Sequence, residues 1–75
     1  MKLLTQDRTG ITTIINEVWL TKYTRNDEYA ILHDSEEMIK CVLGIYPTEQ
    51  RAKEILLDIL RAINEGKATY IMPES

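Results

Sequence analysis

The sequence predicts an α+β domain in which an antiparallel β-meander of about five strands packs against one long C-terminal α-helix. Two observations favour this class. Short apolar segments rich in Ile, Val and Thr alternate with polar turns over the first half of the chain, whereas the second half follows the 3.6-residue period of an amphipathic helix. The length of 75 residues allows one small domain, and 44% hydrophobic with 28% charged residues is typical of a chain that folds.

Strands are expected within residues 2–46. Asp7 and Gly10 suit the first and last positions of a four-residue turn, which predicts a hairpin at the start of the chain. Polar residues then separate the apolar segments that follow. The expected strands are residues 2–6, 11–15, 18–24, 29–33 and 38–46.

The last of these strands has the clearest alternation of apolar side chains. Gly44 lies on its outer row and marks either a bulge or a close approach by another backbone. The row expected to face the core is Ile39, Cys41, Leu43 and Ile45.

A helix is expected at 49–65. Pro47 ends the preceding strand, the Thr48 hydroxyl suits the N-cap, and Gly66 suits a left-handed residue after the last turn. Residues 68–75 are expected to form a short last strand or a tail, because proline stops a strand or confines it to an edge. The apolar stripe expected to cover the sheet is Ala52, Ile55, Leu56, Ile59, Leu60 and Ile63.

Charge and cysteine content argue against several classes of partner. A net charge of −3 with scattered Lys and Arg lacks the clustered basic face of a protein that binds nucleic acid. The single cysteine, Cys41, cannot form an intramolecular disulfide, which fits a reducing compartment. The sequence has no apolar run of about 18 residues and no signal-peptide core, so we expect a cytoplasmic protein without membrane contact.

Three segments carry a resemblance to a known group of proteins. They are LGIYPTEQRAKEIL at 43–56, MKLLTQD at 1–7 and YIMPE at 70–74. Together they resemble small uncharacterised proteins of Gram-positive bacteria (Firmicutes) and their phages. The resemblance implies a strand-to-helix junction near Tyr46 and an origin in a phage or mobile element. It implies no activity, and residues 12–37 match that group only in pattern.

Residues that carry chemistry are few. His33 is followed by Asp34, but neighbouring residues of a strand point to opposite faces, so the carboxylate is poorly placed to orient the imidazole. One His and one Cys do not supply a zinc site, and the isolated glycines form no phosphate loop. We therefore expect no catalytic residue, metal or cofactor. The alternative is a small enzyme or small-molecule-binding domain whose cleft joins His33 and Asp34 to Tyr29 or Tyr46.

Aromatic side chains on the strands give the sharpest functional hypothesis. A sheet covered by one helix leaves its second face for solvent or for a partner, and interfaces favour aromatic residues. These side chains either complete a thin core or form an exposed patch for contact with another protein or with a second copy of the chain. The candidate contact face is Trp19, Tyr23, Tyr29, Ile31, Val42 and Tyr46.

These observations predict a non-catalytic accessory protein that acts through protein-protein contact. The partner is an unknown protein or the chain itself as a homodimer. An alternative is a phage-encoded inhibitor of a host defence enzyme, of the anti-CRISPR kind, because acidic side chains can occupy a basic nucleic-acid channel. A net charge of only −3 gives this alternative little support.

Overall fold

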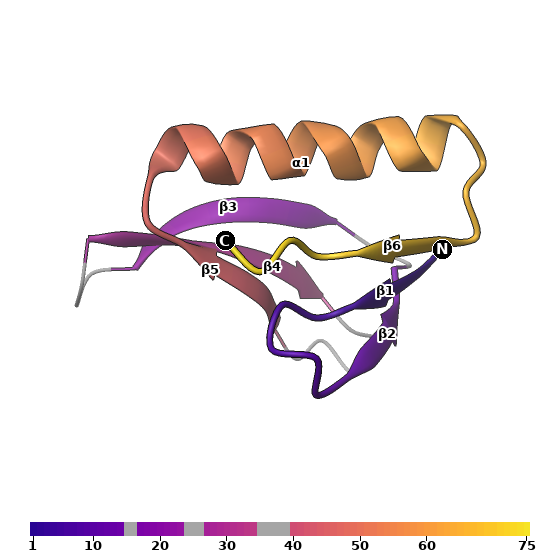
Figure 1. Cartoon of the computed structure of the whole chain (residues 1–75), viewed down its shortest axis with the longest axis horizontal. Helices are drawn as coiled ribbons and strands as arrows, with labels where there is room; N and C mark the ends of the chain where they lie inside the picture. Colours follow the sequence, from indigo (N-terminus) through magenta and orange to yellow (C-terminus); the bar gives the residue numbers. More distant parts are fainter. Residues whose placement is uncertain (15–16, 24–26, 35–39) are drawn as a thin grey trace.

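The computed structural model confirms the predicted α+β class, with strands on one side and a single helix laid across them (Figure 1). It describes residues 1–14, 17–23, 27–34 and 40–75, with the backbone alone at Tyr23 and Lys40. Parts of the expected turns, and the first two residues of the strand expected at 38–46, lie outside these residues. The elements are β1 (Lys2–Leu4), β2 (Ile11–Thr13), β3 (Val18–Tyr23), β4 (Glu28–Asp34), β5 (Lys40–Tyr46), α1 (Glu49–Asn64) and β6 (Thr69–Ile71).

The strands divide between two three-stranded sheets. One sheet has the order β3-β4-β5 and is antiparallel throughout. The other has the order β2-β1-β6, in which β1 pairs antiparallel with β2 and parallel with β6. All five expected meander strands are present, and the short last strand is confirmed as β6. The strands do not share one sheet, because β1 takes β6 as its second neighbour.

Both ends of α1 follow from the residues around them. The Thr48 side chain accepts a hydrogen bond from the Arg51 N–H at 3.1 Å, which confirms the expected N-cap. Gly66 has a φ of +70°, and the Lys67 N–H returns to the Ala62 carbonyl at 3.0 Å. The expected helix is therefore confirmed to within one residue at its C-terminal end.

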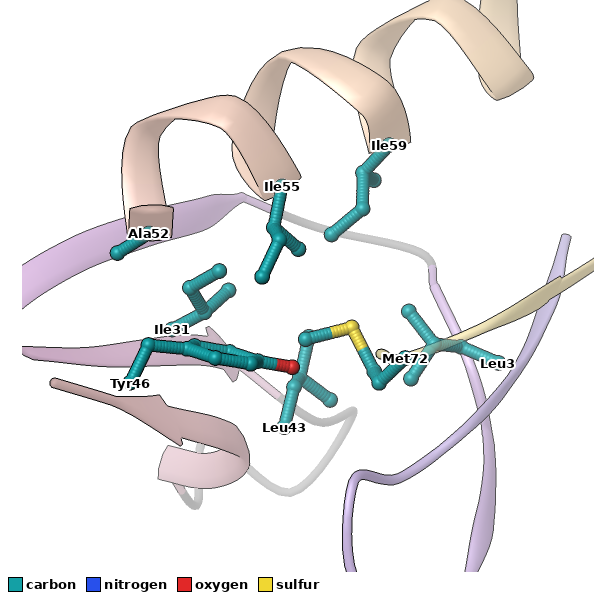
Figure 2. Close-up of a cluster of buried hydrophobic side chains, with 8 residues drawn as sticks. All are labelled: Leu3, Ile31, Leu43, Tyr46, Ala52, Ile55, Ile59 and Met72. Atoms are coloured by element: carbon teal, nitrogen blue, oxygen red, sulfur yellow. The ribbon is translucent and has the colours of Figure 1, made fainter. Parts of the chain in front are cut away.

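The core lies between α1 and the β3-β4-β5 sheet, and both ends of the chain extend it. Figure 2 shows Ile55 and Ile59 pointing from the helix toward Ile31 and Tyr46, with Leu3 and Met72 at one end of the cluster. Because Leu3 lies in β1 and Met72 directly follows β6, the second sheet is joined to the first through apolar contact. The cluster consists of Leu3, Ile31, Leu43, Tyr46, Ala52, Ile55, Ile59 and Met72.

A bulge beside Gly44 changes which side chains of β5 face the helix. Ile31 pairs with Gly44 while Leu32 pairs with Val42, so Leu43 is the extra residue. Leu43 is buried in the core as expected, but Ile45 is only half-buried and outside it. The expectation that Ile45 faces the core is wrong, because alternation restarts after the bulge and turns Tyr46 inward.

The outer edge of β5 is covered by one side chain from the first hairpin. The Gln6 amide donates to the Ile45 carbonyl at 2.9 Å, and its oxygen accepts from the Ile45 N–H at 2.7 Å. The Gln6 N–H also donates to the Leu43 carbonyl at 2.9 Å. Gln6 thus occupies the place of another strand on this edge.

The segments that carry the resemblance meet around the C-terminal tail. The Tyr46 hydroxyl donates to the Pro73 carbonyl at 2.8 Å, and Arg8, the residue after the segment 1–7, donates to the Met72 carbonyl at 2.6 Å. The Gln6 amide also reaches the Glu74 carbonyl at 2.9 Å. These contacts give the three segments a structural role in fastening the tail across the end of the sheet.

Candidate functional site

The face of the β3-β4-β5 sheet turned away from α1 is apolar, and we call it the outer face. Strand alternation and register place Trp19, Leu32 and Val42 side by side in one row across the three strands. Ala30, which is fully buried, and Ile45 form the next row. Val42 is 41% exposed, and Trp19, Leu32 and Ile45 are half-buried outside the core cluster. The outer face therefore presents apolar side chains that the helix does not cover.

Acidic side chains border the outer face. Glu28 and Asp34 lie at the two ends of β4 on the same face as Leu32, because they are separated from it by an even number of residues. Glu17 stands opposite Asp34 and is exposed. An apolar centre with a charged border is the anatomy of a protein interface.

The structure separates the six residues of the candidate contact face. Trp19 and Val42 lie on the outer face, whereas Ile31 and Tyr46 are fully buried against α1 (Figure 2). Tyr29 also lies on the helix side and packs against the core. The side chain of Tyr23 lies outside the described residues. The expectation that Ile31 and Tyr46 are exposed is wrong, because both occupy the helix-facing positions of their strands.

A second apolar surface runs along one flank of α1. It is a groove of about 560 Å³ between the helix and β3. Leu57, Leu60 and Ile63 are 61%, 52% and 45% exposed there. The expectation that Leu60 and Ile63 cover the sheet is therefore wrong in part. We call this surface the flank groove; it is lined by Ile14, Val18, Lys53, Leu56, Leu57, Ile59, Leu60 and Ile63.

The flank groove results from a helix that is apolar over more of its circumference than the sheet can cover. At 100° per residue, the apolar positions from Ala62 to Leu57 span an arc of about 220°. The buried ones among them, Ala52, Ile55, Ile59 and Ala62, occupy less than half of that arc. The opposite flank is charged, and its Asp58 carboxylate accepts from the Tyr70 hydroxyl at 3.0 Å. Sequence reasoning missed the groove because it assigned the whole stripe to the sheet.

The basic residues of α1 each lie beside an acidic neighbour. Lys53 pairs with Glu49 at 2.6 Å, and Arg61 pairs with Asp58 at 3.4 Å. The Lys53 ammonium lowers the pKa of the Glu49 carboxyl by hydrogen bonding and by charge. These pairs are exposed to solvent, and each places a negative charge beside a positive one on the helix surface.

His33 is buried on the helix side of β4, with 1% of its surface exposed. This burial leaves no solvent path to the imidazole, so His33, Asp34 and the tyrosines do not form an open cleft. Among the described residues, neither ring nitrogen has a hydrogen-bond partner, and no group of three metal-ligating side chains is present. His33 is therefore a core residue, and burying its ring nitrogens without a hydrogen-bond partner among the described residues lowers the stability of the fold.

Replacing His33 with leucine is expected to stabilise the protein by about 1 kcal/mol, because an apolar side chain of similar size removes two buried nitrogens that have no hydrogen-bond partner among the described residues. Urea unfolding followed by circular dichroism measures the change. His33→Gln is the control, since it keeps a polar group in the same place and should give no gain. A leucine variant less stable than the glutamine variant would show that the imidazole is satisfied.

Comparison with protein-family models, with curated proteins and with solved structures finds no match. Within the described part of the chain, α1 is neither long nor apolar enough to cross a membrane.

Proposed function

We propose that this chain is a non-catalytic cytoplasmic accessory protein, from a phage or mobile element, that binds another protein through its outer face. The observation that carries the proposal is the row of Trp19, Leu32 and Val42 on the side of the sheet away from the helix. Trp19 lies at one end of this row, and tryptophan is among the residue types that most often dominate binding energy.

The border of the outer face indicates the chemistry of the partner. Glu17, Glu28 and Asp34 place acidic groups around the apolar row, and the chain carries a net charge of −3. A partner surface with an apolar pocket and a basic border is complementary to this arrangement. A partner with a basic nucleic-acid channel would extend the proposal to inhibition of a nucleic-acid enzyme.

Affinity capture from a nuclease-treated Gram-positive lysate tests this role. Val42→Lys places a charge within the apolar row at an exposed position, so we expect it to lose a partner that the natural chain retains at stoichiometric amounts. Gln50→Lys is the matched control, because it adds the same charge at an exposed position of α1 outside both the outer face and the flank groove. The purified partner should also shift the emission of Trp19, the single tryptophan.

The proposal fails if the captured protein is retained equally by the Val42→Lys and natural chains. It also fails if the Gln50→Lys chain loses the protein while the Val42→Lys chain keeps it. Circular dichroism of each variant establishes that it is folded before capture.

A further inference from the structure

The two edges of the β3-β4-β5 sheet differ in whether another described part of the chain forms hydrogen bonds with them. Gln6 covers the edge at β5 through hydrogen bonds to both backbone groups of Ile45. The strand order leaves β3 at the other edge, and no described segment pairs with its outer side. Natural proteins usually shorten, charge or cover such an edge, yet β3 is six residues long.

Backbone alternation identifies the groups on that edge. The Asp34 N–H donates to the Glu17 carbonyl at 3.5 Å, and every second pair along the ladder bonds in the same way. The register between β3 and β4 then turns the N–H and C=O groups of Val18, Leu20 and Lys22 away from β4. The side chains of the same three residues lie on the face that α1 covers.

The flank groove lies between α1 and the Val18 end of this edge. Val18 belongs to both, and the exposed leucines and Ile63 of α1 border the groove from above. Backbone groups and apolar side chains that need a partner are therefore placed together on one side of the molecule. A partner that supplies a strand and an apolar helix flank in the same arrangement would satisfy both.

We propose that this partner is a second copy of the chain, joined by antiparallel pairing of β3 with its counterpart about a two-fold axis. Pairing centred on Leu20 sets Val18 of one copy opposite Lys22 of the other. The outward-facing backbone groups of three residues in one β3 then form hydrogen bonds with those of the same three residues in the other β3. A two-fold axis perpendicular to the sheet keeps both helices on one face. The pairing joins the two three-stranded sheets into one sheet of six strands. The flank groove of each copy then faces the apolar flank of α1 in the other copy.

Two further observations favour a second copy. The chain exposes 5148 Å², about a tenth more than the roughly 4,700 Å² expected of a folded monomer of this mass. A standard interface removes about 800 Å² from each copy, and pairing of β3 together with contact at the flank groove would cover the exposed apolar side chains of α1 in both copies. Because Gln6 covers the β5 edge, the pairing closes at two copies and does not continue into a filament.

Sedimentation of the purified full chain from micromolar to millimolar concentration tests the dimer. Lys22→Pro removes one outward N–H from each copy, and proline is tolerated at a sheet edge, so we expect the dissociation constant to rise about tenfold or more. Lys22→Ala is the matched control, since it removes the same ion pair with Asp27 and keeps the backbone group. Leu60→Glu should weaken the dimer, whereas Gln50→Glu, with the same added charge at an exposed helix position, should not.

Hydrogen exchange identifies the edge that is used. The amides of Leu20 and Lys22 should become more protected as the concentration rises, and this protection should be absent in the Leu60→Glu chain. A monomer throughout the concentration range overturns the proposal, as does a dimer that Lys22→Pro and Leu60→Glu leave unchanged. These results concern only the β3 edge and the flank groove. The outer face is tested separately by the Val42→Lys chain.

Discussion

Replacing Gly44 with alanine is expected to destabilise the protein by about 2 to 3 kcal/mol, the upper part of the range for an overpacked core. An ideal Cβ at this position lies 2.7 Å from the Tyr46 hydroxyl oxygen and 2.8 Å from its Cε2 atom. The tyrosine cannot move away cheaply, because its ring is fully buried and its hydroxyl donates to the Pro73 carbonyl. Urea unfolding of the two chains measures the loss.

Gly10→Ala is the control for this substitution. Nothing lies within 4 Å of a Cβ at Gly10, so its effect should stay within about 0.5 kcal/mol. In a Tyr46→Phe background the alanine at position 44 should cost less, because the closest contact involves the hydroxyl oxygen. An equal cost in both backgrounds would show that the strain arises in the β5 backbone.

The same glycine shows how far the sequence predicts this fold. Alternation over β5 predicts a strand, and Gly44 predicts a bulge or a close approach within it; both occur. The effect of the bulge on the side chains after it was not predictable, because a shift of one residue turns every later side chain of the strand to the opposite face of the sheet. Tyr46 therefore enters the core, and Ile45 turns to the outer face. The helix was predictable because its caps and period depend only on neighbouring residues.

The candidate contact residues were harder to predict than the fold. Trp19 and Val42 reach the outer face as expected, whereas Ile31 and Tyr46 do not, since the face of a strand is decided by partners far along the chain. The exposure of Leu60 depends on the width of the sheet under α1, and the pattern of neighbouring residues does not predict that width. Division of the strands between two sheets also depends on a remote pairing, that of β1 with β6.

Alkaline pH is expected to weaken the fold through Tyr46. Burial raises the pKa of its hydroxyl from 10.0 to about 12, although the positive charges of Arg51 and Arg8 act in the opposite direction. A raised pKa means that the fold favours the neutral phenol. The resulting stability is complete below pH 10 and is lost as the pH rises toward 12, by at most about 1.4 kcal/mol per pH unit. Over this range the loss should approach 2 to 3 kcal/mol.

Urea unfolding of the natural and Tyr46→Phe chains between pH 8.5 and about 11.5 tests this expectation. The lysines also titrate in this range, so the difference between the two chains isolates the phenol. Tyr46→Phe should be the less stable chain near pH 8.5, where it lacks the hydrogen bond to Pro73, and should lose less stability at higher pH. Tyr70→Phe is a second comparison, because burial and the Asp58 carboxylate also raise the pKa of that hydroxyl. Parallel pH profiles for the natural and Tyr46→Phe chains would show that the Tyr46 phenol ionises without opening the core.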